Sequence, residues 1–334
     1  MKTVLRVTAT ILLGLLVAAV AAWGLLALWF GLSTTTGLRV ALCFGFVTVA
    51  VGGLLIAVLR GPVIRPLLPF ALLFIVLLAW WSTIEPSNDR VWQGDVARLA
   101  SAKIDGNLIT LRNIRDFQYT SEIDYVPRWV ERTYDLRRLE TLDLIAVYWM
   151  GDAIAHTMLS FGFDGEQVAI SIEIRKEQGE TYSTLAGLYR RYELYYVVGD
   201  ERDLIGLRTN YRNPPEDVYL YRVTVPREDI RRLFLQYIKK INDLHEHPEF
   251  YNTATTNCTT NIVTHIRTFR KLPLSWKMLL SGYFAEMAYE RGSLDQSLPF
   301  KVLREKSLVN GRARVSEGAD DFSRRIRAGL PGIP

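Results

Sequence analysis

The sequence predicts an α+β protein in which transmembrane helices precede one soluble domain with a mainly antiparallel sheet. Charged residues are rare before Trp81 and dense after Ile84, which separates an apolar region from a soluble one. In the soluble part, the dipeptide Asp164-Gly165 joins two β-rich segments, and such a dipeptide is among the strongest short-range signals for a β-hairpin. After Pro226, apolar residues recur at the spacing of a helix.

Residues 1–84 are expected to form a membrane anchor of three helices, over about residues 7–30, 40–59 and 66–82. A helix needs roughly 20 apolar residues to cross a bilayer, and the first two segments reach this length while the third is slightly shorter. None of the three segments contains Asp, Glu, Lys, Arg or His. Transport and proton relay usually need such groups inside the membrane, so we interpret the helices as an anchor.

Basic residues predict the orientation of this anchor, because Lys and Arg are enriched in cytoplasmic loops. Lys2 and Arg6 precede the first helix, and Arg60 and Arg65 flank the turn between the second and the third. Three spans would then place Ser82 and the residues after it outside the cytoplasm. The membrane is therefore an expected partner of the chain.

The soluble part, residues 85–292, is expected to combine strands with three helices. A short amphipathic helix is predicted over residues 91–102, a second opens at Pro226 and ends at His247-Pro248, and a third follows a candidate N-cap at Asn257 and runs over residues 258–270. Strands are predicted at residues 107–111, 113–119, 142–149, 153–163, 166–175, 192–198 and 218–225. The polar, Arg-rich residues 293–334 are expected to form a loosely packed tail.

Composition argues against several classes of function. The net charge is +5, and Lys and Arg are interspersed with Asp and Glu, so a nucleic-acid partner is not expected. Of the two cysteines, Cys43 lies in an apolar segment and Cys258 in the soluble part, so they are not expected to pair. Because the chain has neither a CxxC nor an HExxH-like spacing, no metal and no cofactor is expected.

Cys258 is the candidate nucleophile. It follows a polar lead-in, Thr255-Thr256-Asn257, and stands where the helix over residues 258–270 is expected to begin. A thiol at a helix N-terminus lies at the positive end of the helix dipole and near free N–H groups, and both favour the thiolate, which is the nucleophilic form. The alternative is a buried structural cysteine.

A nucleophilic cysteine needs a base, and the chain has 4 histidines. His265 would lie ~10 Å from Cys258 along the same helix, too far for a direct hydrogen bond. His245 and His247 stand at the end of a helix, where their expected role is to compensate its dipole. His156 lies in a mostly apolar predicted strand, where it is either the base or a buried structural histidine.

The predicted hairpin sharpens the case for His156. A two-residue turn pairs the residues on either side of the Asp-Gly dipeptide, and counting outward places His156 opposite Glu173. Residues directly opposite in an antiparallel pair share a face, with Cβ atoms ~5 Å apart. Glu173 would then orient the imidazole and stabilise its charged form. A register slip of two would put Ser171 or Arg175 there instead, and Glu173 could also be a surface carboxylate.

Five short segments carry a family resemblance: residues 155–163 (AHTMLSFGF), 171–177 (SIEIRKE), 201–204 (ERDL), 250–252 (FYN) and 257–260 (NCTT). In sequence and in order they resemble the Lnb-type periplasmic domain, a family named after a bacterial lipoprotein N-acyltransferase. The resemblance covers roughly residues 113–270. The order of a strand histidine first and a cysteine later is also similar to permuted papain-like enzymes such as lecithin–retinol acyltransferase, whose nucleophile likewise follows an asparagine.

The resemblance implies a permuted papain-like domain over residues 85–292, with Cys258 as nucleophile and His156 as base. Glu173 or Ser171 would be the polar third group, and Asn257 an auxiliary residue. It also implies a location in the bacterial inner (cytoplasmic) membrane, with the domain in the periplasm. The N-acyltransferase that names the family carries its membrane helices after the domain, whereas this chain carries them before it.

The expected function is that of a membrane-anchored thiol acyltransferase or acyl hydrolase acting on a lipid-linked substrate, such as a lipoprotein or a phospholipid. Trp129, Trp149 and Trp276 are candidates for contacting acyl chains, or are simple core residues. One alternative is a cysteine amidase or peptidase that acts on cell-wall peptide with the same residues. Another is a non-catalytic sensor or scaffold domain.

Overall fold

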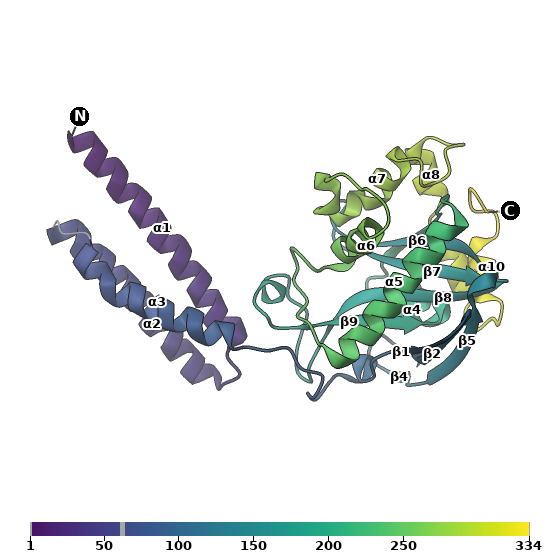
Figure 1. The fold of residues 1–334 in the computed structure, drawn as a ribbon, viewed down its shortest axis with the longest axis horizontal. Coiled ribbons are helices and arrows are strands. Elements are labelled where there is room, and N and C mark those ends of the chain that lie inside the picture. Colours follow the sequence, from purple (N-terminus) through teal and green to yellow (C-terminus); the bar gives the residue numbers. More distant parts are fainter. Residues whose placement is uncertain (1, 61–63, 334) are drawn as a thin grey trace. The chain divides into compact units, whose positions relative to one another are not determined.

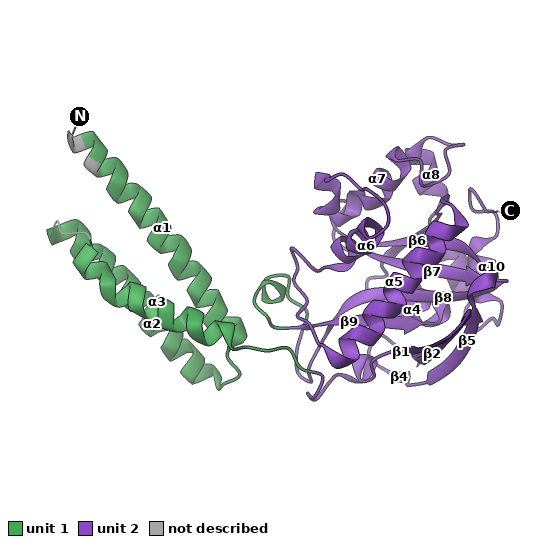
Figure 2. Cartoon of the chain, viewed as in Figure 1, with its two compact units in different colours: residues 1–87, 182–191 green, residues 88–181, 192–334 purple. Residues whose placement is uncertain are grey.

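The computed structural model describes residues 2–60 and 64–333 (Figure 1). The chain divides into two compact units, one of Met1–Ser87 with Tyr182–Arg191 and the other of Asn88–Thr181 with Tyr192–Pro334 (Figure 2). The first unit holds the apolar helices together with a short segment that belongs, by its place in the sequence, to the soluble part. The second unit is the soluble domain.

The first unit contains α1 (Lys2–Gly31), α2 (Thr36–Arg60) and α3 (Ile64–Ser82). Among the described residues, these three helices are long and apolar enough to cross a membrane, which confirms the predicted transmembrane helices. Phe46 and Leu77 are buried between them, whereas large apolar side chains such as Leu55 face outward, where lipid tails are as apolar as leucine. The basic turn predicted between the second and third helices includes residues 61–63, which lie outside the described residues.

The soluble unit is built on a large sheet. Its strands are β1 (Ser101–Asp105), β2 (Leu108–Arg115), β5 (Trp129–Asp135), β6 (Leu139–Tyr148), β7 (Ala155–Phe163), β8 (Glu166–Arg175), β9 (Glu193–Gly199) and β10 (Asp217–Arg222), and β3 (Gln118–Tyr119) and β4 (Tyr125–Val126) form a small separate sheet. In the described part of the chain the large sheet has 8 strands, in the order β1-β2-β9-β8-β7-β6-β10 with β5 paired to β2. Neighbouring strands are antiparallel except for the pair of Arg115 with Gly199. The α+β class and the mainly antiparallel sheet are therefore confirmed.

β7 and β8 form the predicted hairpin. Asp164 and Gly165 have φ angles of 49° and 89°, the left-handed conformation that the turn of a tight hairpin requires. Phe163 pairs with Glu166 across this turn, and the following pairs keep the same register. The predicted turn and its register are therefore confirmed.

Helices cover both faces of the sheet (Figure 1). On one face, α5 (Arg227–Glu246) brings Phe234 against Phe161, with ring centroids 5.0 Å apart, and α6 (Cys258–Arg267) contacts α5, β7 and β8. Successive strand residues point to opposite faces, so Ser160 faces the other side, where it bonds α4 (Glu201–Gly206). A π-helical turn, Leu207–Tyr211, continues α4. The predicted starts of α5 after Pro226 and of α6 after Asn257 are confirmed.

The helix predicted over residues 91–102 is wrong. The segment forms a single 3₁₀ turn and then enters β1. Trp92 and Val96 are both buried, so the helical spacing marks core contacts of an irregular segment. The backbone amide of Gln93 donates to the carbonyl of Lys176 at 3.0 Å, which holds the chain extended beside the end of β8.

The two strands predicted at residues 107–111 and 113–119 are mainly one strand, β2. A bulge between Leu111 and Ile114 lies where the two strands were predicted to be separate. Asn113 has a φ angle of 56°, a left-handed conformation that asparagine adopts more readily than most residues. The predicted break between the two strands is therefore a bulge within one strand.

Residues 293–334 are not a loosely packed tail. They contain α8 (Phe300–Lys306), α9 (Asn310–Val315) and α10 (Phe322–Arg327), after α7 (Phe284–Glu290). Val309, Phe322 and Ile326 are buried with strand residues in the main core of the soluble domain. The segment looks polar in sequence because each helix is short and buries one face only.

Candidate functional site

Cys258 is the first residue of α6, and a capping box fixes this helix start. The Asn257 side chain accepts a hydrogen bond from the Thr260 amide at 2.9 Å, and the Thr260 hydroxyl accepts one from the Asn257 amide at 2.9 Å. The side-chain oxygen of Asn257 is thus committed to the helix start, which it positions. The Cys258 residue, 7% exposed, lies where unpaired first-turn amides and the helix dipole favour a thiolate.

His156, Ser171 and Glu173 are linked by hydrogen bonds. His156 Nε2 lies 2.6 Å from Ser171 Oγ and 3.2 Å from Glu173 Oε1. The Ser171 hydroxyl donates to the same Glu173 oxygen at 2.7 Å, because an ionised carboxylate can only accept. The Ser171 oxygen therefore accepts from the Nε2–H of His156. Both candidates for the third group lie beside the imidazole, and the predicted juxtaposition of His156 and Glu173 is confirmed.

These side chains meet where β7 and β8 separate. Among the described residues, the ladder between the two strands runs from the turn to the pair of Met158 with Ser171 and stops there. β7 continues back to Ala155 in pairing with β6, and β8 continues to Arg175 in pairing with β9. The polar side chains at this end of the hairpin therefore have room to bond one another and the start of α6, which contacts both strands.

Arg208 completes this group of side chains and was not predicted from the sequence. It lies in the π-helical turn after α4, and its Nη2 donates to Glu173 Oε1 at 2.9 Å. Single π-helical turns are uncommon and occur frequently at functional sites. Arg208 lies 35 residues from Glu173 in the chain, so no local pattern connects the two. The available signal is its position shortly after the ERDL segment of the family resemblance.

Electrostatic coupling favours the charged forms of these groups. Burial opposes a charged His156, but attraction to Glu173 and to the Cys258 sulfur outweighs it and raises the pKa of His156 to about 10. Burial also opposes a charged Cys258, but His156 outweighs it and lowers the pKa of the thiol to about 7, with help from the amide and hydroxyl of Thr157. For Glu173, burial is outweighed by His156 and Arg208, so the pKa of this carboxyl lies well below its usual range.

The two ring nitrogens of His156 have different partners. Nε2 is engaged by Ser171 and Glu173, so Nδ1 is the nitrogen left to interact with Cys258, to which the ring is electrostatically coupled. Between about pH 7 and about pH 10, these pKa values favour a thiolate paired with an imidazolium. In that form the cysteine is a nucleophile and the histidine carries the proton.

The other histidines with described contacts serve the structure. His265 Nε2 lies 2.7 Å from the Tyr196 hydroxyl, and burial lowers the pKa of His265 to about 4, so it is a neutral core residue. His245, in the last turn of α5, donates to the carbonyl of Ala100 at 2.7 Å. The structure therefore brings one histidine, His156, to Cys258.

An apolar hollow of about 490 Å³ lies along α6, the helix that begins at Cys258. Its apolar lining consists mainly of Val263, Leu274, Trp276, Met278 and Leu279. Of the tryptophans predicted to contact acyl chains, Trp276 therefore lines this hollow. Trp129 instead packs edge to face against Phe117, with ring centroids 5.0 Å apart, and Trp149 is partly exposed.

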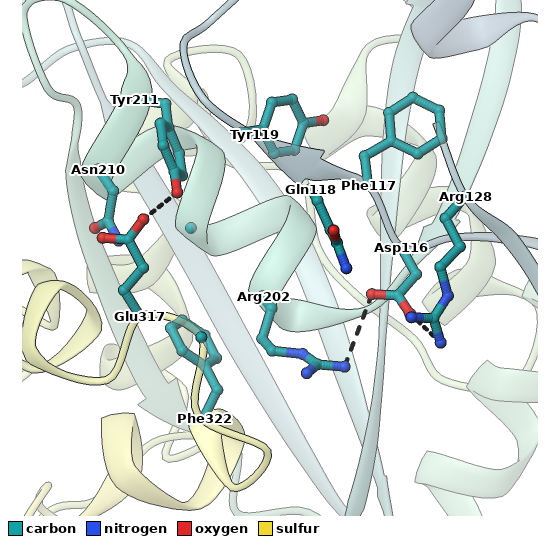
Figure 3. Close-up of a pocket in the computed structure, with 12 residues that line it drawn as sticks. Asp116, Phe117, Gln118, Tyr119, Arg128, Arg202, Asn210, Tyr211, Glu317 and Phe322 are labelled. Carbon is teal, nitrogen blue, oxygen red and sulfur yellow. Dashed lines mark hydrogen bonds and ion pairs between the residues drawn. The ribbon is translucent and has the colours of Figure 1, made fainter. Parts of the chain in front are cut away.

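Another hollow, of about 290 Å³, lies beside α4 (Figure 3). In it, Asp116 faces Arg128 and Arg202, while the Tyr211 hydroxyl donates to Glu317. These charged residues partner one another. Among the described residues, the lining of neither hollow includes Cys258 or His156. We place the candidate site at that pair because its charges are coupled.

The fold and the site define a membrane-anchored protein with one α+β domain and a coupled cysteine–histidine pair. Residues 125–282 match the family model of the Lnb N-terminal periplasmic domain. This range includes the hairpin, Arg208 and the start of α6. Residues 125–282 therefore carry the Lnb-type periplasmic domain, and the chain is a membrane protein with a periplasmic domain. No curated protein and no solved structure matches the chain.

Proposed function

We propose that this protein is a membrane-anchored cysteine acyltransferase or acyl hydrolase acting on a lipid-linked substrate, such as a lipoprotein or a phospholipid. The observation that carries the proposal is the bonded group of His156, Ser171 and Glu173 beside a Cys258 thiol whose pKa is lowered to about 7. A perturbed cysteine with a histidine partner and an acidic third group is the arrangement that nucleophilic catalysis requires.

The reaction begins with the Cys258 thiolate attacking the carbonyl carbon of an ester. The tetrahedral intermediate collapses, the carbon–oxygen bond breaks, and the leaving alkoxide takes the proton from His156 Nδ1. An amine or a water molecule then attacks the thioester while His156 Nδ1 accepts its proton. The carbon–sulfur bond breaks, the thiolate returns, and the acyl group leaves as an amide or a carboxylic acid.

Two parts of the site would stabilise the charges that develop during this reaction. The backbone N–H of Cys258 is a first-turn donor that the helix itself does not use, so it can bind the developing oxyanion. Glu173, held by Arg208 and Ser171, stabilises the imidazolium that must carry the proton. Arg208 and Ser171 are positioning residues in this scheme, because they act through Glu173.

The apolar hollow along α6 supports an acyl substrate over a peptide. Its apolar lining, which includes Val263, Trp276 and Leu279, offers an alkyl chain a surface on which it can leave water. An amidase or peptidase acting on cell-wall peptide would use the same pair but has less use for such a surface. A cysteine at the start of a helix that packs on a histidine strand supports a permuted papain-like architecture, and the anchor and family support residence in the bacterial inner membrane.

Intact-protein mass spectrometry tests the proposal most sharply. The full chain, reconstituted with diacylated lipopeptide or phospholipid, is expected to gain the mass of one acyl group on Cys258. Cys43→Ala is the matched control, because it removes the cysteine in α2 and should keep the adduct. Cys258→Ala should lose it. An adduct that survives Cys258→Ala would contradict the acyl reaction at this residue, and so would peptide products with new amino termini. If the unsubstituted protein forms no adduct at all, the scaffold interpretation is favoured.

A further inference from the structure

The segment Tyr182–Arg191 links β8 to β9, yet it packs with the membrane helices (Figure 2). The chain leaves the soluble unit after Thr181 and returns to it at Tyr192. The two strands that it joins are the neighbours at the centre of the sheet, and β8 carries Ser171 and Glu173. We therefore asked which contacts hold this connection between two strands of the soluble domain in the membrane unit.

Two consecutive arginines tie this segment to the ends of the helices. Arg190 Nη1 donates to the carbonyls of Trp81 and Ile84, each at 3.0 Å, and its guanidinium lies 3.9 Å from the centre of the Trp81 ring. Arg191 Nη1 reaches the carbonyl of Phe30 at 3.5 Å. Trp81 and Phe30 stand at the C-terminal ends of α3 and α1, where unpaired carbonyls and the helix dipole favour a cation.

Tyr189 enters the apolar part of α1. Its ring centroid lies 5.9 Å from that of Phe30 and 6.2 Å from that of Trp23. These two residues stand two turns apart, which is about 10 Å along a helix, so the Tyr189 ring sits roughly one turn inside the end of the span. Tyrosine and tryptophan are enriched at this depth of a bilayer, because their rings are amphipathic.

The remaining apolar side chains of the segment point outward. Tyr182, Leu185 and Leu188 are exposed, and Leu185 is 53% exposed. The backbone amide of Leu188 donates to the carbonyl of Leu185 at 3.0 Å, and in such a 3₁₀ turn side chains three residues apart lie on one side. The segment therefore presents an apolar edge at the level of the transmembrane helix ends.

We propose that residues 182–191 form an interfacial membrane-binding turn. Tyr182, Leu185 and Leu188 insert into the boundary between head groups and acyl chains on the periplasmic face, while Arg190 and Arg191 hold the turn against α3 and α1. Lipid is the partner because the turn packs against helices that span the bilayer. Amphipathic segments bind at the boundary between head groups and acyl chains. The turn is joined directly to β8 and β9, so it is a covalent connection between the two units in addition to the linker after α3.

Depth-dependent quenching tests this proposal without reference to any activity. The full chain with Cys43→Ala and Cys258→Ser carries a single new cysteine, Leu185→Cys, labelled with a nitrobenzoxadiazole fluorophore in nanodiscs of phosphatidylethanolamine and phosphatidylglycerol. The label is expected to be blue-shifted and quenched by lipids with a nitroxide high on the acyl chain, and to resist aqueous iodide several-fold better than a label at Val315→Cys, a site 82% exposed in the soluble unit.

Leu188→Cys provides a second position on the same edge in case one label disturbs the turn. Iodide quenching at residues 185 and 188 as strong as at residue 315, without quenching by the lipid nitroxide, would overturn the proposal. Because the experiment reads depth only, its failure would leave the chemistry proposed for Cys258 untouched. Its success would likewise hold if Cys258 proved unreactive.

Discussion

Two buried polar clusters lie in the soluble domain, and only one of them suits chemistry. The first is the site, with Cys258, His156 and Glu173. The second surrounds Arg327 of α10, which bonds Glu201 at 2.6 and 2.7 Å and Asp143 at 2.9 Å. The side chains of Glu201 and Asp143 are fully buried, whereas those of His156 and Glu173 are 13% and 27% exposed. We call the first cluster open, because solvent reaches its side chains, and the second closed, because its acids are shielded from solvent.

The comparison teaches that buried charge alone does not identify an active site. In the closed cluster each acid faces a guanidinium, since Arg222 Nε also donates to Asp143 at 2.6 Å, and arginine remains protonated at every physiological pH. In the open cluster the pKa of the Cys258 thiol is lowered to about 7, whereas the His156 imidazole keeps its proton up to about pH 10. A buried ion pair fixes the fold, whereas a titratable pair that a substrate can reach is able to react.

Removing Arg327 should produce the largest loss of stability. Arg327→Ala leaves Glu201 buried without its cation and leaves Asp143 with Arg222 alone, and breaking such a buried pair costs roughly 3–5 kcal/mol. Urea unfolding of the full chain in detergent measures this loss. Arg324→Ala is the matched control on the same helix, because Arg324 is 82% exposed and such surface pairs contribute only about 0–1 kcal/mol. Equal losses in the two variants would show that the closed cluster does not hold the fold.

The open cluster should show the opposite behaviour, with small changes in stability and large changes in activity. Cys258→Ala should abolish turnover, and His156→Ala should lower it by roughly 10²–10⁴-fold, the usual contribution of a general base. The double variant should be no worse than Cys258→Ala, because the two residues act as one unit. Kinetics with an ester substrate provide the test, and additive effects of the two changes would contradict a shared step.

Replacing Glu173 should have a smaller effect on activity, and it distinguishes whether Glu173 or Ser171 supports the charged form of His156. Glu173→Gln removes the charge that favours the imidazolium, so the pKa of His156 should fall by about 1–3. The charged ring stabilises the fold fully below pH 6.5, its usual pKa, and this contribution is lost as the pH rises through about 10. The variant should therefore lose stability mainly at acidic and neutral pH. NMR titration of the His156 ring measures the change, and an unchanged pKa would assign the role to Ser171 instead.

The smallest effect is expected at the helix start. Asn257→Ala removes the N-cap of α6, which typically costs about 1 kcal/mol, and the fold of the domain should survive. Thermal unfolding measures the loss. The reactivity of Cys258 should fall only modestly in this variant. A complete loss of reactivity with an intact fold would mean that Asn257 contacts the reacting atoms. That result would contradict the role of its side chain as a helix cap.

Local signals predicted the parts of the fold that local forces determine. The Asp164-Gly165 turn, the start of α5 after Pro226 and the Asn257 cap each depend on residues close in the chain, and each was found from the sequence. The hairpin count also brought His156 to Glu173, because a tight turn fixes the register. The same reasoning could not show that Ser171 lies between them.

Long-range packing determined the parts that the sequence did not predict. Arg208 reaches Glu173 through the path of α4, and the polar segment that ends in α10 is held by a buried arginine. Neither contact leaves a periodic pattern. The helix wrongly predicted over residues 91–102 fails for the same reason, since its apolar residues pack individually against the sheet and not along a helical stripe.

The pH dependence of the alkylation of Cys258 tests the central claim most directly. With Cys43→Ala as the background, iodoacetamide should react at a rate that rises with pH through a midpoint of about 7, because the lowered pKa of the thiol makes it a thiolate above that pH. His156→Ala removes the attraction that opposes burial, so its midpoint should move to about 9 or above, toward or beyond the ordinary value of a thiol. A midpoint that already lies at about 9 in the background protein, and that His156→Ala leaves in place, would contradict the coupled pair.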